Sequence, residues 1–296
     1  MERKVKKLDL FTAVCTAILI ILTLVCLLPI VNVLAISFSG QEAIASGKVG
    51  FWPVDITLMS YKHIMNDVEF FKSLYVSLKR VLIGPFLNLV LIILCSYPLS
   101  KSEKVFPARN IYVWVLYFAT LFGGGLVPTY MVVKETGLLN SFWALIIPES
   151  MQIGYIIMMM NFFRNLPKEL EEAALVDGAS QWRVLCNIYL PLSKASIATI
   201  TLFCIILHWN EWFSGVIYFY NRTGQPMATY LHNIIMEQNV DMMATMDIET
   251  IRKLSEISVQ SINAAKITMA MLPILLVYPF LRKYFAQGIV MGSVKG

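Results

Sequence analysis

The sequence contains six apolar stretches that are each long enough to cross a lipid bilayer as a helix. A transmembrane helix needs about 20 consecutive apolar residues, and the stretches lie at residues 11–36, 81–99, 111–133, 142–163, 196–219 and 264–284. The composition agrees, because 57% of the residues are hydrophobic and 15% are charged, against about 25% charged in soluble domains. The first stretch exceeds the apolar part of a cleaved signal peptide, about 7–15 residues. The sequence therefore predicts an all-α polytopic membrane protein with six transmembrane helices, formed by one domain over residues 1–296.

The distribution of lysine and arginine predicts the orientation, since these residues are enriched in cytoplasmic loops. Fourteen of the 24 lie in segments 1–10, 100–110, 164–195 and 282–296, and the remaining ten are spread over longer segments. We therefore expect a multi-pass protein with both termini in the cytoplasm. A cytoplasmic hairpin is expected at 165–191, and two long outer loops at 37–80 and 220–263. The net charge of +5 is modest and sits beside the apolar runs, which indicates membrane anchoring and no nucleic-acid partner.

The chain lacks the residue patterns of disulfide, metal and nucleotide sites. Its five cysteines are odd in number and form no C-x-x-C pair, and there is no G-x-x-x-x-G-K-[ST] run. We therefore expect no metal and no cofactor bound by this chain. His208 and Glu211 are the only candidate acid–base pair for an intramembrane enzyme, and no H-E-x-x-H occurs. An enzyme is accordingly not expected.

Residues 165–191 read as a helix, a turn and a second helix. Pro167 suits the first turn of a helix, where its missing N–H costs nothing. Asp177 and Gly178 end that helix, because glycine accepts the left-handed conformation at a helix C-terminus. A second short helix is expected over about 180–188. The predicted product is a compact hairpin at the inner membrane surface.

This hairpin resembles the "EAA" loop of binding-protein-dependent ABC importer permeases at every position of the motif. The matching residues are Glu172-Ala173-Ala174, then, after three residues, Gly178, and after nine more, Ile188-x-Leu190-Pro191. Pro191-Leu192-Ser193, Trp209-Asn210 and the ending LPILLVYPFLRKYFAQGIVMGSVKG are similar to the carbohydrate branch, which includes maltose-permease-like and LplC/YtcP-type proteins. The resemblance implies the fold of an ABC type I importer permease.

The resemblance also implies a set of partners and a site. The chain would form half of a heterodimeric pore with a second permease subunit, and bind two ATP-binding subunits that hold ATP and Mg. It would receive an oligosaccharide from an extracytoplasmic solute-binding protein at the bacterial cytoplasmic membrane. The tail 288–296 resembles family tails that run along the ATPase interface. The ATPase-coupling residues implied are Glu172, Ala173, Ala174, Asp177, Gly178, Ile188, Leu190 and Pro191.

Polar and aromatic residues inside the predicted spans are candidates for the substrate path, because burying them in hydrocarbon is costly. Aromatic rings suit the apolar faces of sugars, and amides and carboxylates suit their hydroxyls. The alternative is that these side chains hold helices together by hydrogen bonds, and His208 with Glu211 is expected to form such a pair. The candidates are Asn88, Glu149, Gln152, Tyr155, Trp209, Asn210, Glu211 and Trp212.

The function expected is thus a transport subunit that imports carbohydrate, with ATP hydrolysis in partner subunits. The same importer mechanism for a peptide or a glycerol-phosphate stays open, since only the resemblance favours sugar. A scaffold that borrowed the permease fold is disfavoured, because it would have no need of an ATPase docking loop.

Overall fold

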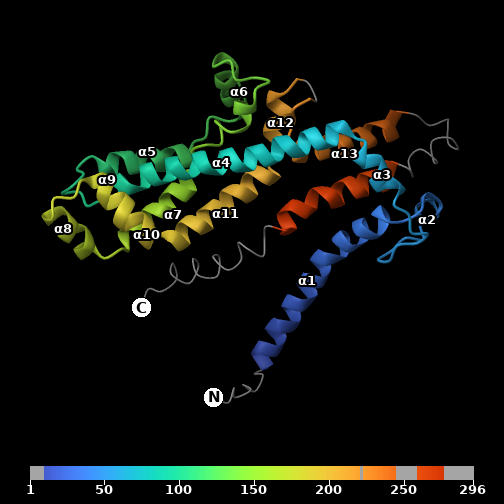
Figure 1. Ribbon diagram of the computed structural model, residues 1–296, viewed down its shortest axis with the longest axis horizontal. Coiled ribbons are helices and arrows are strands. Elements are labelled where there is room, and N and C mark those ends of the chain that lie inside the picture. Colours follow the sequence, from blue (N-terminus) through green and yellow to red (C-terminus); the bar gives the residue numbers. More distant parts are fainter. Residues whose placement is uncertain (1–9, 221–222, 245–258, 277–296) are drawn as a thin grey trace. The chain divides into compact units, whose positions relative to one another are not determined.

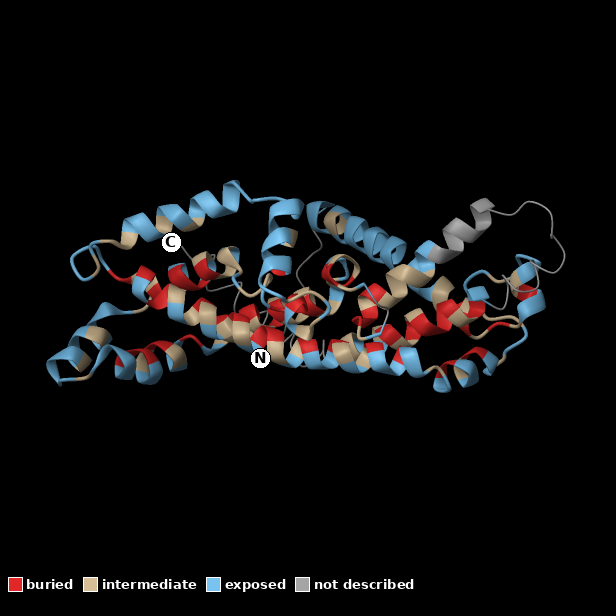
Figure 2. Ribbon diagram, turned by 90° about the horizontal axis from the view of Figure 1, so that it is seen from above, coloured by how far each residue is buried: buried red, intermediate tan, exposed pale blue. Residues whose placement is uncertain are grey.

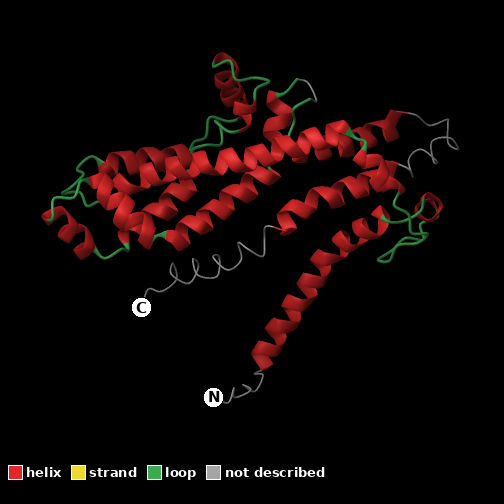
Figure 3. Ribbon diagram, in the orientation of Figure 1, coloured by secondary structure: helices red, strands yellow, loops and turns green. Residues whose placement is uncertain are grey.

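All regular structure in the described part of the chain is helical (Figure 3). The computed structural model describes residues 10–220, 223–244 and 259–276. The tail 288–296 and residues 277–284 of the sixth predicted span lie outside the described residues. The chain divides into two compact units, one of residues 1–70 and 234–272 and the other of residues 71–233 and 273–296. The fold class expected from the sequence is confirmed, and the one-domain organisation stays a prediction.

The first unit contains the N-terminal helix α1, Leu10–Ser37, of which only the C-terminal end has buried residues (Figure 1). Short helices α2 (Gln41–Ala45) and α3 (Met59–Met65) follow it. Most of a later helix, Val259–Leu276, also belongs to this unit. Hydrogen bonds join these elements: the hydroxyls of Ser37 and Tyr61 lie 2.8 Å apart, and those of Ser60 and Ser261 lie 2.7 Å apart. The most apolar window of α1 has no buried residue, so this helix offers its apolar surface to lipid or to a neighbouring subunit.

The long helix α4, Val68–Ser100, is the backbone of the second unit. It begins at Val68 rather than at residue 81, so residues 68–80 are helical and do not belong to the predicted outer loop. The predicted span begins after Lys79 and Arg80 because charges are costly in a span. Arg80 is nevertheless fully buried. It belongs to a face of buried small and polar residues, which permits close helix packing. From Ser73 to Asn88 they are spaced three or four apart, and Ser96 follows two turns later; these are Ser73, Ser77, Arg80, Gly84, Asn88 and Ser96.

The third predicted span is broken. Helices α5 (Arg109–Leu121) and α6 (Leu126–Glu135) meet at an angle of 112°. Three consecutive glycines, 123–125, separate them, and Gly125 has a φ of +80° that disfavours other residues. The continuous helix expected over 111–133 is therefore two helices with a sharp bend.

The fourth and fifth predicted spans are also interrupted. Over 142–163 the structure has a short 3-10 helix η1 (Phe142–Leu145), an irregular segment, and helix α7 (Ile153–Arg164). Pro148 lies in the irregular segment, where it cannot donate a backbone hydrogen bond and disfavours helix before it. Over 196–219 the structure has helices α11 (Lys194–Asn210) and α12 (Phe213–Tyr218).

The number of membrane spans follows from these helices only in part. Three described helices are long and apolar enough to cross a bilayer: Leu10–Ser37, Val68–Ser100 and Val259–Leu276. Two bent pairs raise the number to five if each counts as one span, and the apolar helix Ile153–Arg164 is shorter. Several apolar helices fit the predicted membrane fold, and the count of six spans stays a prediction.

The core of the second unit lies where the C-terminal half of α4 packs against α7, α11 and the 165–191 hairpin. Figure 2 shows buried residues as red bands on packed helices, beside long pale-blue stretches of exposed surface. The hairpin itself consists of α8 (Lys168–Val176), α9 (Gln181–Val184), the π-helical turn η2 (Leu185–Tyr189) and α10 (Leu190–Leu192). Helix α13 (Met227–Ala244) lies outside this core and begins within the second unit. The buried core side chains include Ile92, Tyr97, Ile156, Met159, Phe163, Leu185, Tyr189, Ile200 and Cys204.

Candidate functional site

The 165–191 hairpin has the helix–turn–helix form expected from its sequence. Helix α8 ends at Val176 with Asp177 as its C-cap, and Gly178 follows with a φ of +79°, in the left-handed region. The amide of Gly178 donates to the carbonyl of Leu175 at 3.1 Å, which closes the helix end. Ser180 caps the next helix by accepting a hydrogen bond from the backbone N–H of Arg183 at 3.3 Å. The turn angle between the helices therefore depends on a glycine conformation.

The motif residues of the hairpin divide between two faces. Ala174, Ile188 and Leu190 are half-buried against the core of the second unit. Glu172, Ala173, Asp177, Gly178 and Pro191 are exposed. Two large apolar side chains beside them are also exposed, Val176 at 88% and Trp182 at 66%. One face of the hairpin is thus seated on the core, and the other presents small, acidic and apolar groups outward.

An ion pair fastens α8 to the end of α4. The Nζ atom of Lys101 lies 2.6 Å from Oε1 of Glu171, and both side chains are largely shielded from solvent, with 7% and 14% exposed. The hydroxyl of Tyr189 donates to the other oxygen of Glu171 at 2.5 Å. Lys101 also lies 4.0 Å from the ring centre of Tyr97 and 4.3 Å from that of Tyr189, where cation–π attraction is favourable. The cluster of Tyr97, Lys101, Glu171 and Tyr189 joins three segments.

The shielding of this cluster shifts the pKa values of two of its members. Burial lowers the pKa of Lys101 below its ordinary value, and the hydrogen bond and charge of Glu171 partly offset that change. Burial, followed by the hydrogen bond to Glu171, raises the pKa of the Tyr189 hydroxyl. Tyr189 therefore stays a neutral hydrogen-bond donor at physiological pH.

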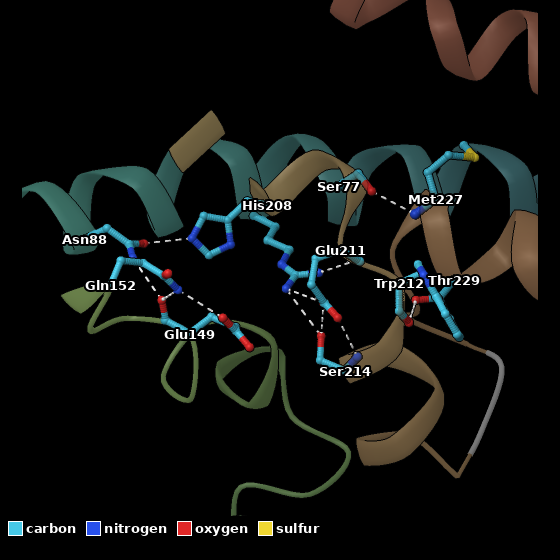
Figure 4. A network of polar contacts seen from close by, with 11 residues as sticks. Ser77, Asn88, Glu149, Gln152, His208, Glu211, Trp212, Ser214, Met227 and Thr229 are labelled. Atoms are coloured by element: carbon cyan, nitrogen blue, oxygen red, sulfur yellow. Dashed lines mark hydrogen bonds and ion pairs between the residues drawn. The ribbon is translucent and has the colours of Figure 1, made fainter. Parts of the chain in front are cut away.

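A second polar cluster lies where α4 meets the end of α11 (Figure 4). Arg80, fully buried, donates through Nη2 to Oε2 of Glu211 at 2.7 Å and through Nη1 to the carbonyl of Glu211 at 2.9 Å. Glu211 also accepts from the backbone N–H of Ser214 at 2.8 Å and from the Ser214 hydroxyl. The buried guanidinium is thus paired through both of its terminal nitrogens, as a buried charge requires, while its Nε has no hydrogen-bond partner among the described residues.

Asn88 connects α4 with the irregular segment before α7 and with α11. Its side-chain N–H groups donate to the carbonyls of Glu149 and Ser150 at 2.9 and 3.0 Å. These bonds satisfy carbonyls left free by the break in the fourth predicted span. The Oδ1 atom of Asn88 then accepts from Nε2 of His208 at 2.8 Å, which places the imidazole hydrogen on Nε2. His208 packs against Gly84, where an added methyl group would meet Nε2 at 2.5 Å.

These contacts correct one expectation from the sequence. His208 and Glu211 form no hydrogen bond with each other within the described residues, because His208 bonds to Asn88 and Glu211 pairs with Arg80. The i, i+3 spacing predicts that both residues share one helix face, but α11 ends at Asn210 and Glu211 lies in its extended C-cap. The chain direction changes there, so each side chain meets a different partner on α4.

The structure places the remaining substrate-path candidates in separate environments. Glu149 and Gln152 precede α7 and are bonded together, Nε2 to Oε2 at 3.0 Å, so the helical face expected to unite them with Tyr155 does not form. Tyr155 stacks on Phe203 with ring centres 5.8 Å apart. Trp209 is half-buried, and Asn210 and Trp212 are exposed. Trp212 stacks on His232 with ring centres 4.0 Å apart.

Sequence reasoning misses the partners that hold both clusters. The sequence analysis places Arg80 in the predicted outer loop 37–80. It counts Lys101 only among the basic residues that predict the orientation of the chain in the membrane. The signal that points to Arg80 is its spacing with Ser73, Ser77 and Gly84, which continues the helical period of the span beyond its charged residues. For Lys101 no local pattern exists, because its partner Glu171 is distant in the sequence.

Comparison with known proteins gives a consistent result over most of the chain. The profile of a family described as "Binding-protein-dependent transport system inner membrane component" matches residues 81–291. The chain is 36% identical over 287 residues to the polygalacturonan/rhamnogalacturonan transport system permease protein YtcP of Bacillus subtilis (strain 168), covering 97% of this chain and 99% of that protein. It is 37% identical over 270 residues to the protein LplC of the same organism, covering 91% and 90%.

A solved structure has the same fold. It belongs to a bacterial ABC transporter involved in the import of the acidic polysaccharide alginate. Its matching chain superposes with a TM-score of 0.83 at 28% sequence identity and covers 96% of this chain and 100% of its own length. The broken helices described above therefore belong to an architecture found in an importer.

Proposed function

This chain belongs to the family of binding-protein-dependent transport system inner membrane components, and on that premise we propose that it is one membrane-spanning half of an ATP-driven carbohydrate importer. It is a multi-pass membrane protein and a transport component, not an enzyme. Its partners are a second permease subunit, two ATP-binding subunits that hold ATP and Mg, and an extracytoplasmic solute-binding protein. Both termini lie in the cytoplasm.

The observation that carries the proposal is the two-faced 165–191 hairpin. Its exposed face, with Glu172, Ala173, Val176 and Trp182, has the small, acidic and apolar groups that suit a groove in an ATP-binding subunit. Val176 and Trp182 are large apolar side chains exposed on a motif-bearing hairpin, which suits a protein interface better than a face that meets only water. Glu172 is placed to pair with a basic group of that groove.

The seated face of the hairpin passes motion on to the spans. Lys101 and Glu171 fasten α8 to α4, and the helical segment Gln181–Leu192 leads directly to α11 across a bend of 81°. At its far end α11 meets α4 again through His208 with Asn88, and through Glu211 with Arg80. We therefore expect a displacement of the hairpin to move helices α4 and α11 together, as one packed body.

The substrate proposed is an oligosaccharide. Support comes from the named relatives, a polygalacturonan/rhamnogalacturonan permease and a transporter that imports the acidic polysaccharide alginate. Of the sequence-predicted path residues, Asn210 and Trp212 are exposed, with one ring face of Trp212 stacked on His232 and the Asn210 amide donating to Ile206. Asn88 and Glu211 hold other elements in place, and Glu149 is bonded to Gln152. We assign Trp212 to the apolar face of a sugar and Asn210 to a hydroxyl.

The test is the ATPase rate of the complex reconstituted with its binding protein. A panel of galacturonate, alginate and neutral oligosaccharides, peptides and glycerol-phosphate separates the solute classes. Stimulation by an oligosaccharide is expected. Stimulation by a peptide or glycerol-phosphate alone would keep the importer mechanism and refute the substrate class.

A further inference from the structure

A basic cleft lies between the hairpin and the start of α5. Its volume is about 710 Å³, and it is bounded by the end of α4, the start of α5, the end of α7 and helix α8. Two carboxylates, Glu171 and Glu172, line it, against a larger set of cations: Lys101, Lys104, Arg109, Arg164 and Lys168. The lining is therefore net positive, and a cleft of one charge sign concentrates ions of the opposite sign.

Of the five cations that line the cleft, Lys101 is the one that forms an ion pair with a carboxylate among the described residues. Lys101 is neutralised by Glu171. Arg109 and Arg164 both donate to the carbonyl of Leu99, at 2.8 and 3.2 Å, and Arg164 also donates to the sulfur of Met160 at 3.4 Å. A guanidinium has five N–H donors, so each arginine retains donors. Within the described residues neither arginine forms an ion pair with a carboxylate.

The cleft borders an exposed apolar face of α5. Arg109 is the first residue of α5. The residues that follow it in α5 form an exposed apolar face, including Ile111, Trp114 at 73% exposure and Val115. An exposed apolar helix in a multi-pass membrane protein contacts acyl chains, and tryptophan is enriched at the level of the headgroups. A cleft beside such a face has access to headgroups at the border of the hydrocarbon.

We propose that this cleft binds the phosphate of an anionic phospholipid headgroup. Arginine recognises phosphate through paired, charge-assisted hydrogen bonds, and Arg109 and Arg164 converge on one carbonyl, which brings their guanidinium groups together. Lys104 and Lys168, both exposed, add charge at the rim. Basic pockets at the inner face of membrane proteins hold anionic headgroups by this chemistry.

The site places a lipid beside the hairpin. Glu171 and Glu172 of α8 line the same cleft as the two arginines. A phosphate bound there offsets the repulsion among the cations that surround α8. The bound lipid therefore stabilises the seated position of the hairpin, and this inference requires only that the chain spans a membrane, not that it imports sugar.

The test is lipid retention by the full transporter complex, measured by native mass spectrometry from nanodiscs of phosphatidylcholine with increasing phosphatidylglycerol. The variant Lys104→Gln/Lys168→Gln changes two exposed side chains, so its fold is preserved. Each charge near an anionic headgroup contributes about 1 kcal/mol, which is about a fivefold change in affinity. We expect about a 25-fold weaker retention of phosphatidylglycerol, from two such charges, and a further loss for Arg109→Gln/Arg164→Gln. The matched control Arg183→Gln, an exposed arginine outside the cleft, should retain lipid as the unmodified protein does.

Three results would overturn the proposal. The first is equal retention of phosphatidylglycerol by the Lys104→Gln/Lys168→Gln variant and the control. The second is complete displacement of phosphatidylglycerol by inorganic phosphate, which would make this a site for the free ion. The third is loss of the ATP-binding subunit from that variant with lipid retention unchanged, which would assign the cleft to an acidic segment of that subunit.

Discussion

Replacing Lys101 by methionine is expected to loosen α8 from α4 by about 2 kcal/mol. Exposed ion pairs contribute about 0–1 kcal/mol, and breaking a buried pair costs about 3–5 kcal/mol. Lys101 and Glu171 are 7% and 14% exposed, so their pair lies between these limits. Tyr189 still donates to Glu171 after the change, which lowers the cost. About 2 kcal/mol corresponds to about a thirtyfold increase in local opening of α8.

Hydrogen exchange of the backbone amides over 168–176, in the reconstituted complex, measures this opening directly. Glu171→Gln should give a similar loss of protection, since it removes the same charge pair. The matched controls are Lys72→Met, an exposed lysine on α4, and Glu169→Gln, an exposed glutamate on α8. Both controls should leave exchange over 168–176 unchanged.

The double variant Lys101→Met/Glu171→Gln decides whether the two side chains act together. If they stabilise the hairpin as a pair, the double variant loses little more protection than either single one. Unchanged exchange in Lys101→Met would refute the reasoning, as would losses that add in full. Uptake per ATP hydrolysed should fall in both single variants with the ATP-binding subunit still attached.

Three further perturbations test other parts of the structure. Gly178→Pro fixes φ near −65°, against the observed +79°, and removes the amide that closes α8; a cost of about 3 kcal/mol or more at the turn should abolish uptake while membrane insertion persists. Glu172→Lys reverses an exposed charge on the hairpin and should weaken co-purification of the ATP-binding subunit. Gly84→Ala places a methyl group 2.5 Å from Nε2 of His208 and should destabilise the detergent-solubilised protein by about 1–3 kcal/mol, seen as a lower unfolding temperature.

Each perturbation has a matched control. Gly137 shares a left-handed φ of +69° and also donates its amide to a nearby carbonyl, so Gly137→Pro carries the same backbone cost away from the hairpin. If it abolished uptake equally, backbone strain rather than coupling would explain Gly178→Pro. Glu169→Lys controls for charge on α8. Gly154→Ala adds a methyl group with nothing within 4 Å, and an equal loss of stability there would contradict the packing argument for Gly84.

The helical class and the hairpin are predictable because their signals are local. An apolar run of about 20 residues indicates a helix that lies in the hydrocarbon of a bilayer. The helix end at Gly178 follows from a left-handed conformation that glycine adopts more readily than other residues. Ala174, Ile188 and Leu190 are half-buried, which fits their place in the motif that the hairpin shares with importer permeases. Such signals lie within a few residues of the feature they specify.

The breaks in the spans are harder to predict, because they depend on distant partners. Residues 149 and 150 lie outside any helix, where the Asn88 side chain of α4 donates hydrogen bonds to their carbonyls. Hydropathy reads 142–163 as one span, since it registers apolar character and not the partner that stabilises a break. The same holds for Arg80, whose charge is offset by Glu211, far away in the sequence.

The most direct test of the central claim is the ATPase rate of the reconstituted complex, with and without the sugar-loaded binding protein, for the unmodified chain and for Lys101→Met. The account predicts that an oligosaccharide stimulates hydrolysis by the unmodified complex and that Lys101→Met uncouples that stimulation from uptake. An intact complex, with the ATP-binding subunits attached, that no oligosaccharide stimulates would contradict it.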